Sequence, residues 1–162
     1  MKWIKAILTG FLGSLIMFLL MMLGIYGTGI APFNVPPSAA FLIKLGLPAK
    51  PLALIVHFGY GAFWSLLLVY LYKEQTNIKK GLGLALVAWL IMMVIYSPII
   101  GWGFFGFGGA SALNPTNPLF LEAGPKYLIS TLVLHLIFGA VIGWINPKWI
   151  RFSATEAKEK IA

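Results

Sequence analysis

Four long apolar stretches, separated by polar or proline-rich segments, dominate the hydropathy pattern of the chain. They cover about residues 6–26, 52–72, 81–100 and 127–145. A bilayer core of roughly 30 Å needs about 20 mostly apolar residues in helical form, and each stretch is long enough. The pattern therefore predicts an all-α integral membrane protein, a four-transmembrane-helix bundle that forms a single membrane domain over residues 1–162.

The segments between the stretches contain further helix signals. The connections at about residues 27–51 and 101–126 are long and rich in proline and glycine. Ser38–Gly46 combines a serine suited to an N-cap with a terminal glycine, which predicts a short helix lying in the membrane interface. We expect Leu119–Ala123 to be its counterpart in the second connection.

Two prolines predict where the helices bend or end. Ser97-Pro98 lies near the outer end of the third stretch, and we expect it to kink that helix, because proline removes a backbone donor. Asn146-Pro147 is expected to end the fourth helix. The tail that follows, residues 148–162, is expected to be a solvated helix or a frayed end.

The composition excludes several classes of protein. The chain is 60% hydrophobic and 10% charged, whereas a soluble domain carries about 25% charged residues. It has no cysteine and no aspartate, and its four glutamates lie outside the apolar stretches. Disulfide frameworks, cysteine nucleophiles and paired-carboxylate chemistry are therefore not expected, and we predict a non-catalytic protein.

The net charge of +8 is a signal of membrane topology. Three basic residues, Lys44, Lys50 and Lys126, flank the side of the two long connections. The other nine flank the side of the termini: Lys2, Lys5, Lys73, Lys79, Lys80, Lys148, Arg151, Lys158 and Lys160. Under the positive-inside rule this predicts cytoplasmic N and C termini in a prokaryotic plasma (inner) membrane. We expect the lipid bilayer and other membrane subunits as partners, and we expect no binding of nucleic acid.

The second and fourth stretches resemble each other. Residues 54–62, Leu-Ile-Val-His-Phe-Gly-Tyr-Gly-Ala, align with residues 132–140, Leu-Val-Leu-His-Leu-Ile-Phe-Gly-Ala, at an offset of 78. Leu15-Ile16-Met17 aligns with Leu90-Ile91-Met92 at an offset of 75. We therefore predict an internal repeat of two helical hairpins with the same orientation, about residues 1–75 and 76–150.

The repeat makes His57 and His135 pseudo-equivalent, and both are expected in the outer half of the bilayer. They are the only histidines in the chain, and an intramembrane ionisable residue is a functional candidate. Gly61 and Gly139 follow them by four residues, and Gly143 continues the second groove. The pattern predicts one haem b, with both imidazoles as axial metal ligands and the three glycines making room for the macrocycle.

Two other interpretations of the histidines are open. In the first, the imidazoles combine with thioethers to bind Cu(I), the candidate sulfurs being those of Met17, Met21, Met92 and Met93. In the second there is no cofactor, and the small-residue faces pack helices together. Each histidine then bonds a backbone carbonyl or a polar neighbour across the helix interface, the candidates being Ser14, Ser130 and Thr131.

Three short motifs carry a resemblance over most of the chain. These are His57-Phe58-x-x-Gly61, Pro98-x-x-Gly101-x-Gly103-x-Phe105 and His135-x-x-x-Gly139-x-x-x-Gly143. Together they resemble a family of small four-span prokaryotic membrane proteins with a histidine-glycine motif in the second and fourth spans. The resemblance implies a four-helix topology and brings no activity, substrate or cofactor with it. Phe138 departs from the pattern, in which a tyrosine is expected.

These observations lead to an expected function. We expect a small electron-transfer or accessory subunit of a larger respiratory-type membrane complex, holding one haem b between His57 and His135. The alternative is a cofactor-free scaffold or assembly subunit that packs against neighbouring helices and lipids. A small transporter is a further alternative that the parallel repeat suggests, although no predicted span carries a carboxylate or a lysine for ion coupling.

Overall fold

The computed structural model describes residues 2–159, and it describes side chains as far as Trp149. The helices are α1 (Lys2–Met22), α2 (Pro37–Lys44), α3 (Leu52–Tyr72), α4 (Ile78–Ile91), α5 (Ser97–Ile100) and α6 (Lys126–Glu159). Four helical segments are long and apolar enough to cross a membrane: Lys2–Gly27, Leu52–Gln75, Ile78–Ile100 and Lys126–Trp149. The predicted all-α architecture with four membrane-spanning helices is therefore confirmed.

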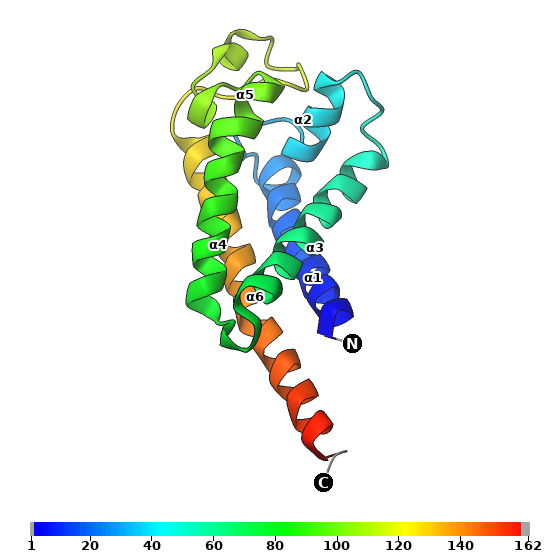
Figure 1. Ribbon diagram of the computed structural model, residues 1–162. Helices are drawn as coiled ribbons and strands as arrows, with labels where there is room; N and C mark the ends of the chain where they lie inside the picture. Colours follow the sequence, from blue (N-terminus) through cyan, green and yellow to red (C-terminus); the bar gives the residue numbers. More distant parts are fainter. Residues whose placement is uncertain (1, 160–162) are drawn as a thin grey trace.

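The long helices form two pairs (Figure 1). Helix α1 packs along α3, α4 packs along α6, and contacts between α1 and α6 join the pairs. Helix α3 diverges from α4 toward the end of the bundle that carries α2, α5 and the long connections, whereas the start of α1 lies at the opposite end (Figure 1). We call these two ends the loop end and the terminal end.

Within each pair the backbones touch at glycines. An ideal Cβ atom on Gly61 of α3 would collide with Ser14 Oγ and would lie 2.8 Å from the Gly10 carbonyl oxygen of α1. An ideal Cβ atom on Gly139 of α6 would lie 2.6 Å from the carbonyl oxygen of Gly81 in α4. Small residues thus bring the helices together where no hydrophobic effect drives their association.

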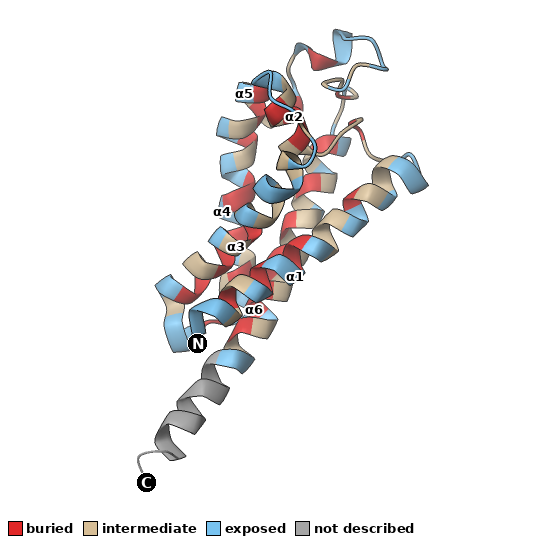
Figure 2. Cartoon of the chain, turned by 90° about the vertical axis from the view of Figure 1, so that its right-hand side faces the viewer, coloured by how far each residue is buried: buried red, intermediate tan, exposed pale blue. Residues whose placement is uncertain are grey.

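The described basic side chains divide between the two ends of the bundle. Lys44, Lys50 and Lys126 belong to the loop end by their positions in the chain. The described basic side chains of the terminal end are Lys2, Lys5, Lys73, Lys79, Lys80 and Lys148, whereas the side chains of Arg151 and Lys158 and all of Lys160 lie outside the described part. The outward faces of the helices are exposed (Figure 2) and largely apolar, which is compatible with a membrane protein.

The two long connections fold onto each other at the loop end. Trp102 is fully buried, its indole Nε1 donates a 2.9 Å hydrogen bond to the Leu119 carbonyl oxygen, and its ring contacts those of Phe33 and Tyr127. The helix expected at Leu119–Ala123 is wrong, because this segment is not helical and runs from a turn at Leu119 to a bend at Ala123. Its Leu121 forms an isolated antiparallel bridge with Phe33 in the other connection, a partner that local sequence does not reveal.

The expected end of the fourth helix at Asn146-Pro147 is also wrong, because α6 continues through Pro147 to Glu159. The side chain of Asn146 bridges the affected turn. Its amide donates 3.0 Å hydrogen bonds to the Ile142 carbonyl oxygen and to Ser65 Oγ of α3. Pro147 has no N–H for the Gly143 carbonyl oxygen, and the Asn146 bonds tie the preceding turn of α6 to α3 rather than replace that missing hydrogen bond.

The third span is distorted before Pro98. A π-helical turn, Met92–Tyr96, separates α4 from α5, and Pro98 lies in the first turn of α5. The first span ends in a similar π-helical turn at Leu23–Gly27, which was not expected. π-Helical turns change the direction in which helical side chains point, and they frequently occur at functional sites.

The short helix predicted at Ser38–Gly46 is present as α2, with one difference at its start. Helix α2 begins at Pro37, and Pro36 is the N-cap residue, so Ser38 lies inside the first turn. No side-chain hydrogen bond caps this helix. The Ser38 hydroxyl is therefore not used for capping, contrary to the expectation.

Candidate functional site

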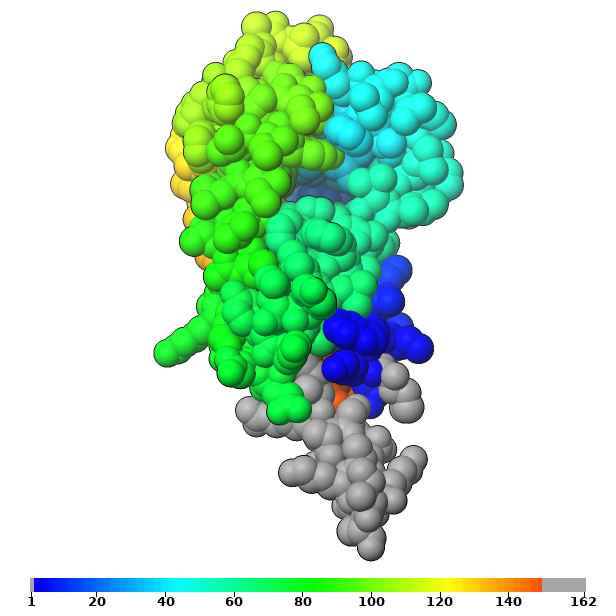
Figure 3. Space-filling view, in the orientation of Figure 1, coloured from blue at the N-terminus to red at the C-terminus, as the bar shows by residue number. Residues whose placement is uncertain are grey.

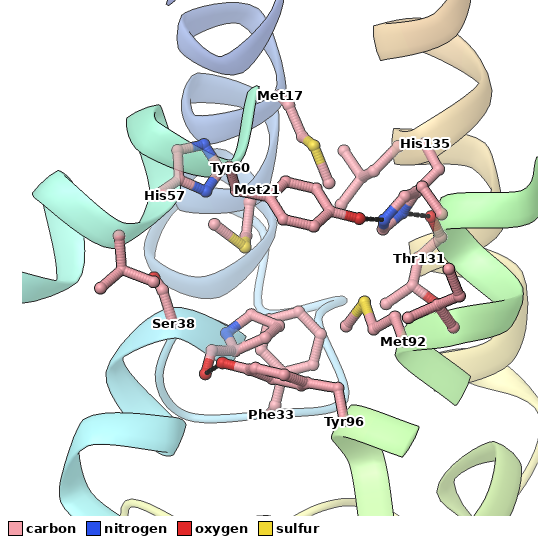
Figure 4. A pocket seen from close by; sticks show the side chains of 15 residues that line it. Met17, Met21, Phe33, Ser38, His57, Tyr60, Met92, Tyr96, Thr131 and His135 are labelled. Atoms are coloured by element: carbon pink, nitrogen blue, oxygen red, sulfur yellow. Dashed lines mark hydrogen bonds between the residues drawn. The ribbon is translucent and has the colours of Figure 1, made fainter. Parts of the chain in front are cut away.

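A cavity of about 140 Å³ lies near the loop end, between the diverging parts of α3 and α4. Residues of α1, α3, α4 and α6 line it, and Pro37 and Ser38 of α2 contribute to its wall. The lining contains both histidines, one hydroxyl-bearing aromatic side chain and three thioethers: His57, His135, Tyr60, Met17, Met21 and Met92 (Figure 4). We call this space the central cavity.

His57 comes from the first helical pair. Its Nε2 atom lies 2.9 Å from the backbone carbonyl oxygen of Ser14 in α1. Because a carbonyl oxygen only accepts, Nε2 carries the proton, and Nδ1 of the neutral ring keeps a lone pair. The rings of Phe18 and Phe58 hold the imidazole at centroid distances of 5.6 and 5.5 Å. Within the described residues, Nδ1 has no hydrogen-bond partner.

His135 comes from the second pair, and both of its ring nitrogens are used. Nδ1 donates to the Thr131 carbonyl oxygen at 2.8 Å, which leaves Nε2 to accept from the Tyr60 hydroxyl at 3.2 Å (Figure 4). Thr131 Oγ1 in turn accepts a 3.1 Å hydrogen bond from Trp89 Nε1. The imidazole is buried in a hydrogen-bond network that fixes its tautomer and orientation.

Part of this network was expected from the sequence. Ser14 and Thr131 were candidate partners of the histidines, and both bond through their backbone oxygens. The bond to Ser14 crosses a helix interface as expected, whereas Thr131 lies on the same helix as His135. Tyr60 was not expected in the site. Tyr60 follows His57 by three residues, so helical spacing places both on one face. The Tyr60 hydroxyl bonds His135. Phe138, the residue of the fourth span at the offset of 78 from Tyr60, has no hydroxyl.

The central cavity does not fit a haem. Both histidines line one cavity, as axial ligation requires, but Tyr60 lies between them, and its hydroxyl engages His135 Nε2 (Figure 4). A cavity of about 150 Å³ accommodates a molecule the size of benzene, far smaller than a macrocycle. The glycines expected to make room, Gly61, Gly139 and Gly143, receive neighbouring helix backbone instead and do not line the cavity.

The methionines proposed for copper divide into two groups. Met17, Met21 and Met92 line the central cavity. Met93 is fully buried in the adjacent hydrophobic core and points elsewhere. Helical geometry explains the division, because Met92 and Met93 are consecutive and consecutive residues point about 100° apart.

The central cavity opens sideways. Val56 of α3 and Ile91 of α4 line it and are nevertheless 38% and 43% exposed. The space-filling view shows a hollow between these helices, with atoms of α1 visible at its back (Figure 3). We call this opening the lateral mouth. Both helices are long and apolar enough to cross a membrane, and the opening lies between them on the side of the bundle.

Comparisons with known proteins give no match to this chain among family models, curated proteins or solved structures. The family resemblance therefore stays a prediction, and the functional argument depends on the central cavity.

Proposed function

We propose that this protein is a small, non-catalytic integral membrane accessory subunit that binds a lipophilic molecule in the central cavity. The observation that carries the proposal is the lateral mouth, because a cavity that opens into hydrocarbon selects molecules that partition into lipid. Ligand sites are typically concave and apolar, with a few polar groups that fix orientation. The central cavity has this composition, since apolar side chains surround His57, Tyr60 and Ser38.

The partners in this proposal are the lipids and the helices of other membrane subunits. The outward faces of α1 and α3 support it, because they expose many large apolar side chains. Electron transfer within a respiratory-type complex stays a prediction. The present proposal uses no haem.

The proposal includes the internal repeat, for which the cavity lining offers support. Two pairs of lining residues, Val56 with Leu134 and His57 with His135, lie at the offset of 78. Two more, Met17 with Ala88 and Met21 with Met92, lie at an offset of 71. Gly10 and Gly81, which contact Gly61 and Gly139, have the same offset of 71. We therefore propose this register for the first and third spans in place of 75, with the cavity between the two halves.

A substitution at the lateral mouth tests the proposal. We expect Val56→Trp to weaken binding of a ring-fluorinated hexylbenzene by about tenfold or more, or about 1.4 kcal/mol, because the indole blocks entry. Fluorine NMR of the protein in nanodiscs measures the affinity, with empty nanodiscs as the background. The matched control is Ile55→Trp, whose site is the neighbouring residue, 64% exposed, and not part of the lining.

The control is expected to bind the hexylbenzene as the original protein does. Equal affinity in Val56→Trp and Ile55→Trp would contradict entry through the lateral mouth. Absence of saturable binding in the unsubstituted protein would remove the proposed function.

Cu(I) binding is a second candidate, favoured by the thioethers of Met17, Met21 and Met92 around a histidine with an unused lone pair. Thioether and imidazole ligands suit Cu(I). If this candidate holds, Met21→Leu and Met92→Leu abolish stoichiometric Cu(I) binding in competition with a chromogenic chelator, whereas Met22→Leu, outside the lining, leaves it intact. Retention of one Cu(I) per chain in both variants, or no Cu(I) in the original protein, refutes this candidate.

A further inference from the structure

We infer that the bound molecule carries a hydroxyl group on a single ring, that is, a phenol or quinol head with a hydrocarbon tail. The inference rests on the proposed function and specifies the ligand of the same cavity. In this arrangement the ligand hydroxyl donates to His57 Nδ1 and accepts from Ser38 Oγ.

The polar groups of the central cavity differ in whether the protein already satisfies them. On one side, Tyr60, His135 and Thr131 bond to one another. The Tyr96 hydroxyl also has a partner, because it donates to the Pro37 carbonyl oxygen at 2.8 Å. These groups need no ligand.

The opposite side has unused hydrogen-bonding capacity. His57 and Ser38 lie on this side, across the cavity from His135 (Figure 4). His57 Nδ1 retains a lone pair, and the Ser38 hydroxyl has no hydrogen bond within the described residues and does not cap α2. An acceptor and a hydroxyl without partners in the described part of the chain therefore both border the same largely apolar cavity.

A hydroxyl group matches this pair because it donates and accepts at once. A ketone oxygen only accepts, so it would bond Ser38 and leave His57 Nδ1 without a donor. An anionic head is disfavoured, because no lysine or arginine lines the cavity to compensate for its lost hydration.

The size and the walls of the cavity determine the rest of the molecule. At about 140 Å³ the space suits a single six-membered ring. The rings of Phe33 and Tyr96 and the sulfur atoms of Met21 and Met92 line it, and both kinds of group favour aromatic partners. A chain attached to the ring leaves between Val56 and Ile91 and lies in the bilayer.

Three ring-fluorinated probes test the inference in nanodiscs by fluorine NMR: hexylphenol, its O-methyl ether and hexylbenzene. We expect the original protein to bind the phenol about tenfold more tightly than the ether, which corresponds to about 1.4 kcal/mol. His57→Phe is expected to abolish this preference, because only the phenol donates a hydrogen bond. Ser38→Ala is expected to weaken binding of the phenol relative to hexylbenzene, because it removes the donor to the ligand oxygen. Neither variant should weaken hexylbenzene binding, because the alkylbenzene makes no hydrogen bond.

Ser130→Ala is the matched control, since Ser130 lies on α6 outside the lining and should leave the preference unchanged. If the original protein binds all three probes equally, the inference is wrong and the proposed function stands. If it binds none of them, both are wrong. Should His57→Phe fail to fold, Ser38→Ala decides alone, because an unchanged ratio of phenol to hexylbenzene affinity there overturns the hydroxyl assignment.

Discussion

Trp102→Ala is expected to lower the free energy of unfolding by about 3–5 kcal/mol, the usual cost of removing a buried aromatic side chain. Trp102 is fully buried and packs against Phe33 and Tyr127 at centroid distances of 5.9 and 5.1 Å. The substitution leaves a void and also deprives the Leu119 carbonyl oxygen of its donor. Both effects loosen the connections that cover the loop end.

Denaturant unfolding in detergent micelles, followed by circular dichroism, measures this loss. Phe104→Ala is the matched control, because Phe104 is an aromatic residue of the same connection and is 62% exposed. Surface substitutions of this kind usually change stability by no more than about 0.5 kcal/mol. Similar losses in the two variants would show that Trp102 does not hold the connections together.

The effect should extend to ligand binding. Phe33, which lines the central cavity, contacts Trp102 directly. We therefore expect Trp102→Ala to weaken hexylbenzene binding as well, whereas Phe104→Ala should not.

The second large effect is expected for Gly61→Ala, which should destabilise the bundle by about 1–3 kcal/mol through overpacking. The added methyl group meets Ser14 Oγ and the Gly10 carbonyl oxygen. Because the second of these neighbours is backbone, α1 and α3 must move apart. The same displacement stretches the hydrogen bond from His57 Nε2 to the Ser14 carbonyl oxygen.

Gly59→Ala is the matched control for this substitution. Gly59 lies on the same helix, and an added Cβ atom has no neighbour within 4 Å. Alanine is favoured over glycine in a helix by about 0.5–1 kcal/mol, so the control should be neutral or stabilising. Opposite signs in the two variants, measured by the same unfolding experiment, identify the helix contact as the cause. A neutral Gly61→Ala would contradict the close approach of α1 and α3.

The pair Gly81→Ala and Gly83→Ala repeats the experiment between α4 and α6. A Cβ atom on Gly81 meets the Gly139 carbonyl oxygen, whereas one on Gly83 meets nothing within 4 Å. We expect the same opposition of signs there. Agreement between the two pairs would also support the proposed register of 71 between the first and third spans.

Prediction failed where long-range contacts override local signals. Pro147 is a strong local signal for the end of a helix, yet α6 continues through it, and Asn146 beside it bonds Ser65 of α3. Leu119–Ala123 forms no helix, and its Leu121 pairs with Phe33, far away in the sequence. Ser38, which was expected to cap α2, lies two residues after the actual N-cap residue, because Pro36 is the N-cap and the helix begins at Pro37.

The candidate site was predicted only in part, because contacts between distant helices also complete it. His57 and His135 stand out in the sequence as the two histidines of the chain, and the structure brings both to one cavity. Tyr60 was missed because its importance comes from the position of His135 on another helix. The sequence showed that the glycines leave space on their helix faces. Whether a cofactor or a neighbouring helix occupies that space depends on helix packing.

The four spanning helices and the concentration of lysines at one end could be predicted from the amino acids, because hydrophobicity and charge act residue by residue against water and lipid. Three features could not: Met92 borders the cavity while Met93 does not, Tyr60 reaches His135, and α3 and α4 diverge into a lateral mouth. These features depend on the distance and rotation between helices, which are set by side-chain packing between segments far apart in the chain.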